Sequence, residues 1–216
     1  MKPVAVVRFP GTQCDQDVVK AIKLLHYPVK TIGHADRFSP KDYSAFILPG
    51  GFSYGDYLRA GALAVHSQAM QDIYKAAEAG RPILGICNGF QILCEAGLLE
   101  GTLQVNQTLR FIDKWVELEL IHSCSVWGGD QIKKTVCIPI AHKEGRFYAS
   151  EEKMKMLQDQ SLIWWKYKKN PNGSLESIAG IMNKQKNVAG LMPHPERAMA
   201  EWMGGTAGIS FFKTFF

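Results

Sequence analysis

Residues 82–97 read PILGICNGFQILCEAG, and this stretch decides the first part of the fold. Residues 82–86 are a short apolar run, which is typical of a buried strand. Residues 90–96 have the apolar spacing of a helix, and a glycine follows at the position where a helix stop is expected. The stretch therefore predicts a buried strand and a helix that are joined by a sharp turn.

Cys87 stands at that turn, and a glycine lies two residues to either side of it, at Gly85 and Gly89. A nucleophile at a sharp strand-to-helix turn requires such small residues, because the two backbones approach closely there. A helix N-terminus also favours a thiolate and lowers a thiol pKa from its usual value of about 8.5. Free cysteines are more often core residues, but this context favours Cys87 as the nucleophile of a cysteine amidase. Cys14 also follows a strand end, but it lacks the flanking glycines.

An amidase also needs two hydrogen-bond donors for the oxyanion that develops during attack. The backbone N–H of Asn88, directly after the nucleophile, is one expected donor. The second is expected from Gly51 or Phe52, which follow the apolar run 45–48. This predicts an oxyanion hole formed by backbone groups from two neighbouring strand ends.

A thiol nucleophile requires a base, and the base requires an orienting group. Two His-x-Glu pairs are present, one at residues 142–144 and one at residues 194–196. Prolines on both sides of His194 keep that segment out of a helix and predict an extended backbone, in which His194 and Glu196 share one side. The apolar run 188–192 would deliver this pair to the carboxyl edge of the sheet. We therefore expect His194 to be the base and Glu196 its partner, while His142 lines the site or contacts a partner protein.

The remaining sequence predicts an α/β fold. Apolar runs and helical patterns alternate through the first half, which is typical of a flavodoxin-like parallel sheet with helices on both faces. The second half is mostly strand-like and predicts additional mixed or antiparallel strands. Strands are expected at residues 4–9, 29–32, 45–48, 82–86, 115–121, 136–140, 162–167, 178–182 and 188–192. Helices are expected at residues 15–25, 65–79, 90–96, 150–157 and 206–216, the last with Thr206 as its N-cap.

Composition narrows the class of protein. The chain has 216 residues, 46% of them hydrophobic, which suits one domain over residues 1–216. No run approaches the roughly 18 apolar residues of a membrane helix, so we expect a soluble, cytoplasmic protein that does not bind membranes. The five cysteines have no paired spacing, which argues against disulfides and against a metal site. The net charge of +5 is scattered along the chain, so nucleic acid is not an expected partner.

The motifs resemble those of a known family. Gly-Ile-Cys-Asn-Gly-Phe-Gln at 85–91 and Pro-His-Pro-Glu at 193–196 are similar to class I (triad) glutamine amidotransferases. Within that family, the chain looks like the glutaminase subunits of phosphoribosylformylglycinamidine synthases. The segments that carry this closer resemblance are residues 9–12, 49–61, 138–142, 170–174 and 192–197.

The resemblance implies that glutamine is the substrate and that Cys87, His194 and Glu196 hydrolyse it to glutamate and ammonia. It further implies that Gln91 and Gly51 bind glutamine. It also implies that the loop 52–61 lies near both the site and a docking surface, so that Arg59 lines the site or contacts a partner protein. In the family a large synthetase subunit takes the ammonia and uses ATP and Mg²⁺ to convert formylglycinamide ribonucleotide to formylglycinamidine ribonucleotide, and a small accessory subunit helps the complex to assemble. No cofactor is expected in this chain, which has no glycine loop of the P-loop type.

Three positions depart from the pattern of the family. Gln13 stands where asparagine is expected, Lys143 where glycine is expected, and Lys166 where arginine is usual. If position 143 needs a positive φ, lysine costs about 1 to 2 kcal/mol there. None of the three belongs to the triad, so we expect them to change contacts with partner proteins.

Three other functions compete with this interpretation. One is a glutaminase subunit that serves a different synthetase, such as one for carbamoyl phosphate or anthranilate. Another is a stand-alone cysteine hydrolase on the same sheet. The third is a non-catalytic binding module, which the intact set of Cys87, His194 and Glu196 disfavours.

Overall fold

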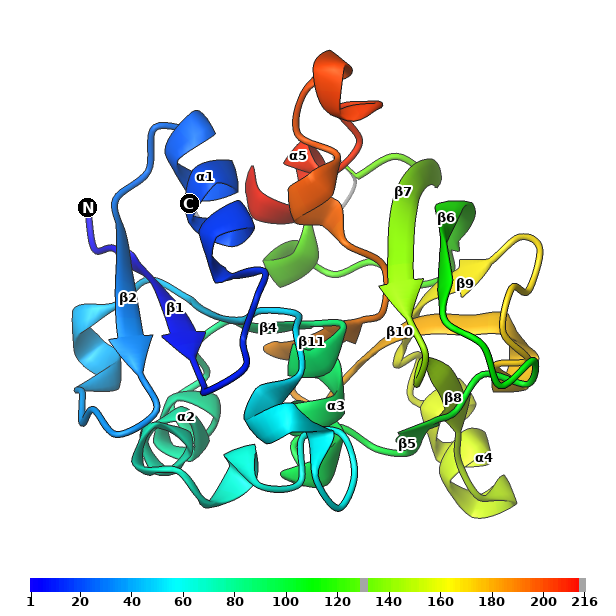
Figure 1. Cartoon of the computed structure of the whole chain (residues 1–216), viewed down its shortest axis with the longest axis horizontal. Coiled ribbons are helices and arrows are strands. Elements are labelled where there is room, and N and C mark those ends of the chain that lie inside the picture. Colours follow the sequence, from blue (N-terminus) through cyan, green and yellow to red (C-terminus); the bar gives the residue numbers. More distant parts are fainter. Residues whose placement is uncertain (129–131, 214–216) are drawn as a thin grey trace.

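The computed structural model describes residues 1–128 and 132–213, and within them nine strands form one sheet in the order β2-β1-β3-β4-β11-β10-β9-β6-β7 (Figure 1). The first five strands in this order are parallel to one another. They are β2 (Val29–Gly33), β1 (Val4–Arg8), β3 (Phe46–Leu48), β4 (Ile83–Ile86) and β11 (Val188–Leu191). All residues of β3, β4 and β11 are buried, as expected for parallel strands that are covered on both faces.

The other four strands are antiparallel and continue the same sheet. They are β10 (Ile178–Met182), β9 (Ile163–Tyr167), β6 (Ile112–Leu120) and β7 (Thr135–His142). The predicted α/β fold with additional antiparallel strands is therefore confirmed. The structure adds a second sheet of two three-residue strands, β5 (Thr102–Gln104) and β8 (Arg146–Tyr148), which are too short to give a clear sequence signal.

Helices cover both faces of the parallel strands. In Figure 1, α1 (Asp15–Leu24) and α5 (Ile209–Phe212) lie on one side, and α2 (Gln68–Glu78) and α3 (Asn88–Glu95) lie on the other. The remaining helix among the described residues, α4 (Glu151–Asp159), begins where the sequence predicted. The Ser150 side chain caps it by accepting a hydrogen bond from Lys153 N. No helix in the described part of the chain is long and apolar enough to span a membrane.

The C-terminal helix differs from its prediction. It begins at Ile209, after Gly208, and Thr206 is not its N-cap; residues 214–216 of the predicted helix lie outside the described residues. A Cβ at Gly208 would clash with the carbonyl oxygen of Pro195, so the two backbones touch here. This close contact delays the start of the helix, because residues 204–208 form turns that bring the chain against residue 195.

The parallel strands end together at the edge of the sheet where the predicted site lies. In the strand register Leu48 of β3 pairs with Gly85 of β4, and Ile86 of β4 pairs with Leu191 of β11. The segments that follow these strands therefore emerge side by side. At the far end of the sheet order, β7 contacts the turn η7 (Pro195–Arg197), so the antiparallel half curves back across this edge.

Close packing of α3 against β3 leads to a test of the turn. A Cβ at Gly89 would clash with the carbonyl oxygen of Leu48, and one at Gly85 would lie 2.6 Å from Gly89 O. We expect Gly89→Ala to lower the free energy of unfolding by about 3 kcal/mol, because the helix must move away from the strand. Gly97→Ala is the control: its position is open and costs only about 1 kcal/mol for its φ of +67°. Urea unfolding measures both, and equal losses would contradict the close approach.

Candidate active site

Cys87 occupies the sharp turn between β4 and α3. Its backbone has φ 51° and ψ −106°, a strained conformation for a residue with a side chain, and its N–H donates to Leu191 O at 2.8 Å. Cys87 is 6% exposed, and its thiol donates to Ala141 O over 3.8 Å. The turn predicted from residues 82–97 is confirmed, and its strain is held by hydrogen bonding to the neighbouring strand.

His194 and Glu196 form a buried pair. The Nδ1 atom of His194 lies 2.6 Å from Oε1 of Glu196, and the side chains are 2% and 0% exposed. Contrary to the extended backbone that the sequence predicted, the two are brought together by the 3₁₀ turn η7, which begins directly after His194. Proline is favoured at the first position of such a turn, because its missing N–H would have no partner there. The expected pairing is present, but a different backbone conformation produces it.

Charge around His194 favours its protonated form. Burial lowers the pKa of His194, but the Glu196 carboxylate and the thiols of Cys87 and Cys14 outweigh burial and hold the pKa well above its usual value. Because Nδ1 contacts Glu196, the Nε2 atom is the one left for a nucleophile, and it has no other partner among the described residues. This arrangement suits an ion pair of thiolate and imidazolium.

Two backbone N–H groups are available for an oxyanion. Those of Gly51 and Asn88 donate to no group in the described part of the chain, whereas the N–H of Phe52 donates to Gly11 O at 3.0 Å. Gly51 has φ 141°, and a Cβ there would lie 2.6 Å from Gln13 N. The geometry therefore favours Gly51 over Phe52 as the second donor, and Phe52 instead contributes to the cavity wall.

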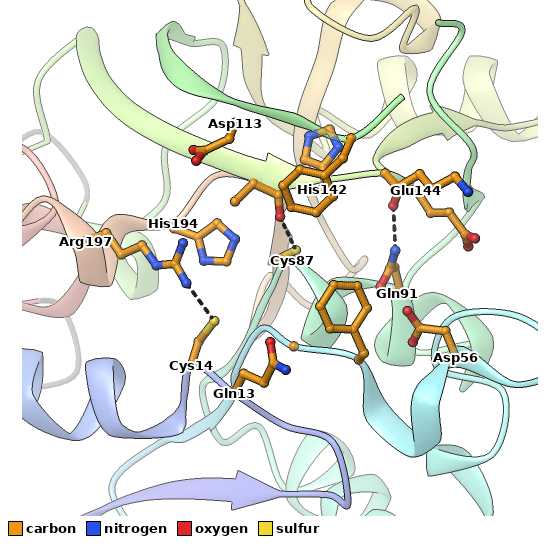
Figure 2. A pocket seen from close by; sticks show the side chains of 15 residues that line it. Gln13, Cys14, Asp56, Cys87, Gln91, Asp113, His142, Glu144, His194 and Arg197 are labelled. Carbon is orange, nitrogen blue, oxygen red and sulfur yellow. Dashed lines mark hydrogen bonds between the residues drawn. The ribbon is translucent and has the colours of Figure 1, made fainter. Parts of the chain in front are cut away.

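Most of the predicted site residues line one cavity of about 290 Å³ (Figure 2). These residues are Gly51, Phe52, Cys87, Gln91, His142 and His194. Glu196 contacts His194 from behind and Asn88 directly follows Cys87, but neither is among the lining residues. Arg59 is not among the lining residues; its Nη2 atom contacts Glu95 Oε2 at 2.6 Å on the surface. A partner contact for Arg59 stays a prediction.

Gln91 is held by protein groups at both ends of its amide. Its Oε1 atom accepts a hydrogen bond from Asn88 Nδ2 at 2.9 Å, and its Nε2 atom donates to Glu144 O at 2.5 Å. The side chain thus ties the loop at residues 143–145 to α3 along one wall of the cavity. Direct binding of glutamine by Gln91 stays a prediction.

His142 is a neutral imidazole in the cavity wall. Asn106 donates through Nδ2 to the carbonyl oxygens of His142 and Arg110, both at 2.9 Å, which leaves its Oδ1 as acceptor for His142 Nδ1–H at 3.1 Å. Burial and the charge of His194 lower the pKa of His142 to about 4. The ring lies where a Cβ of Gly145 would be, so glycine is required beside it.

Sequence reasoning missed Cys14 as a member of the site. Its thiol, a ring nitrogen of His194 and a carboxylate oxygen of Glu196 lie within 4.8 Å of one another, and Arg197 Nη2 donates to the thiol at 3.2 Å. Such a set can hold a soft metal ion such as Zn²⁺, although His194 and Glu196 are hydrogen-bonded to each other. The signal that points to Cys14 is its place after β1, directly before α1.

The three departures from the family pattern have different settings. Lys143 lines the cavity, and its φ is not positive, so the expected cost of lysine at that position does not arise. Gln13 also lines the cavity. Lys166 pairs with Glu176 at 3.0 Å, away from the cavity. Their effect on partner proteins stays a prediction.

The strand-to-helix cysteine, the His–Glu pair and the mixed sheet are the features that the sequence led us to expect of a glutamine amidotransferase. The chain matches the CobB/CobQ-like glutamine amidotransferase domain over residues 1–207 and belongs to that family. This confirms the resemblance seen in the sequence.

Solved structures extend this result. The chain is 43% identical to a chain in the structure of PurLQS from Thermotoga maritima, with a TM-score of 0.89, and the match covers 100% of this chain and 98% of that one. Two further matches show the fold alone. One, a putative GMP synthase subunit from Thermoplasma acidophilum, is 14% identical, with a TM-score of 0.65 and coverage of 100% and 92%. The other, a glutamine amidotransferase from Thermotoga maritima, is 17% identical, with a TM-score of 0.63 and coverage of 94% and 81%.

Proposed function

We propose that the chain is the glutaminase subunit of phosphoribosylformylglycinamidine synthase. The observation that carries the proposal is the cavity in which Cys87, at its strained turn, lies with His194, and with Glu196 behind the imidazole. The 43% identity to a chain of PurLQS over the whole length supports the choice of this synthase. The subunit-specific segments of the sequence, such as residues 49–61, support the same choice.

The proposed reaction has two steps, in which His194 acts first as an acid and then as a base. Glutamine binds with its carboxamide carbon next to the Cys87 thiolate, which attacks it, and the N–H groups of Gly51 and Asn88 hold the oxyanion. His194 gives its proton to the departing ammonia, which leaves a glutamyl thioester on Cys87. Water then attacks the thioester with His194 as base, and glutamate leaves. Glu196 keeps the imidazole oriented and stabilises its positive charge.

The ammonia is used by a partner in this proposal. The chain has no P-loop motif, and we assign the ATP- and Mg²⁺-dependent amidation of formylglycinamide ribonucleotide to a large synthetase subunit. A small accessory subunit completes the proposed complex. The cytoplasmic location, the absence of a cofactor in this chain and the single domain over residues 1–216 belong to the same proposal.

The test is to mix the chain with the synthetase subunit, the small subunit, ATP, Mg²⁺ and formylglycinamide ribonucleotide. We expect amidine formation from glutamine to require this chain, and amidine formation from ammonium to proceed without it. The same chain with a carbamoyl phosphate or anthranilate synthetase serves as the control for a different acceptor. Rapid glutamine hydrolysis by the chain alone, with no gain from any synthetase, would instead support a stand-alone hydrolase.

A further inference from the structure

Two carboxylates lie together at one end of the cavity, which we call the acidic end. Figure 2 shows Asp56 and Glu144 at this end, on one side of Cys87, whereas His194, Arg197 and Asp113 lie on the other side. The end with His194 holds the catalytic imidazole, so the carboxamide of a substrate belongs there. The acidic end has no part in the reaction steps above, and sequence reasoning did not identify it.

The Asp56 carboxylate is held in a fixed place relative to the nucleophile. Asn88, the residue directly after Cys87, donates from Nδ2 to Asp56 Oδ1 at 3.2 Å, and its own Oδ1 accepts from Ser53 N at 3.0 Å. Asn88 is 1% exposed, so this link is buried. Asp56 itself has φ 54°, an uncommon conformation for a non-glycine residue. One buried side chain therefore sets the position of Asp56 with respect to the thiol.

Glu144 reaches the same end of the cavity from the opposite wall. Its backbone is tied to α3 by the hydrogen bond from Gln91 to Glu144 O. Asn88 also donates to Gln91, so one buried network positions both acidic residues. The network places them at the same end of the cavity and close to the turn that carries Cys87.

Neither carboxylate is neutralised by the protein. Among the described residues, no lysine, arginine or histidine forms an ion pair with Asp56 or Glu144. Burial, and then the charge of Glu144, raise the pKa of Asp56 to about 6, although the hydrogen bond from Asn88 acts in the other direction. Two like charges in a partly buried cavity attract a cation, which removes their mutual repulsion.

We infer that Asp56 and Glu144 bind the α-ammonium group of glutamine and thereby select the free amino acid over other carboxamides. This inference rests on the proposed function. Glutamine carries its carboxamide and its α-ammonium group at opposite ends of a short chain, which matches the two ends of the cavity. Lys143 lines the same cavity and supplies a cation for the α-carboxylate. A carboxamide without an α-ammonium group would leave the two carboxylates unpaired.

The experiment compares two substrates in the assembled synthase. One is glutamine, and the other is 4-carbamoylbutanoate, which has the same carboxamide and carboxylate but no α-ammonium group. Asp56→Asn removes the charge and keeps an acceptor for Asn88. Because a charge-assisted hydrogen bond is lost, we expect kcat/KM for glutamine to fall about 10- to 100-fold, mainly through KM. For 4-carbamoylbutanoate we expect kcat/KM to stay within about twofold, so the preference for glutamine collapses.

Two controls and two contrary results complete the test. Glu144→Gln should act in the same direction as Asp56→Asn, whereas Asp159→Asn, at the exposed end of α4, removes the same charge and should leave both substrates unchanged. The ammonia-dependent rate reports whether the complex is intact. Equal loss on both substrates, or loss of the ammonia-dependent rate, would overturn the inference and assign Asp56 to docking. If the wild-type complex shows no glutamine-dependent rate, the proposed function fails instead.

Discussion

Replacement of Cys87 by alanine is expected to lower glutamine-dependent amidine formation by about 10⁴-fold or more, because alanine has no thiol to form the thioester at the strand-to-helix turn. The ammonia-dependent rate should remain within about twofold, since it bypasses the cavity. Cys87 sits at a position that a smaller side chain can occupy without a clash, and the backbone contact from its N–H to Leu191 O is kept. Parallel assays with glutamine and with ammonium separate the loss of chemistry from damage to the complex.

Cys14 is the matched control for this prediction. It is the other thiol that acts on His194, and it lies with His194 and Glu196 within 4.8 Å. We expect Cys14→Ala to keep at least about a tenth of the glutamine-dependent rate, because Cys14 does not lie at a strained strand-to-helix turn and the donor Asn88 directly follows Cys87, not Cys14. If Cys14→Ala abolishes the rate and Cys87→Ala does not, Cys14 is the nucleophile and the assignment of Cys87 is wrong.

The second large effect concerns Glu196. We expect Glu196→Gln to lower the glutamine-dependent rate by about 10³- to 10⁴-fold, because the amide cannot stabilise the imidazolium and its NH₂ group can impose the wrong tautomer on His194. Glutamine has nearly the same shape as glutamate, and Glu196 is 0% exposed, so the fold should tolerate the change. Single-turnover formation of the thioester measures the chemical step directly.

A change in the protonation of His194 should accompany this loss. The carboxylate of Glu196 is the main group that raises the pKa of His194, so Glu196→Gln should lower that pKa. NMR titration of the imidazole reports the shift independently of activity. Glu95→Gln is the control, because it makes the same chemical change at a surface ion pair with Arg59. A rate loss below about tenfold for Glu196→Gln would mean that Glu196 does not orient the base.

Local features of the chain explain why much of the site is predictable. The turn at Cys87 depends on the glycines at 85 and 89 and on the apolar run before them, and all of these are neighbours in sequence. The His194–Glu196 pair is also local, and it forms even though its backbone is a 3₁₀ turn and not an extended segment. Sterics and short-range spacing act within a few residues, so their outcome is visible in the sequence.

The same reasoning fails where contacts join distant segments. Arg197 donates to Cys14, 183 residues away, and nothing near Cys14 indicates this contact. Asp56 meets Glu144 only because the loop after β3 and the loop after β7 border one cavity. The start of α5 was also mispredicted, since its delay depends on the contact between Gly208 and Pro195.

The sequence by itself determined the alternating α/β core, the cysteine at its sharp turn and the His–Glu pair, because backbone sterics and apolar periodicity are short-range properties. Only the tertiary structure decided that the antiparallel half curves back so that β7 forms a wall of the cavity, and which charged groups lie close to one another there. Electrostatic interactions depend on distance in space and not on separation along the chain. For that reason the acidic end of the cavity and the position of Cys14 beside His194 could be identified only in the tertiary structure.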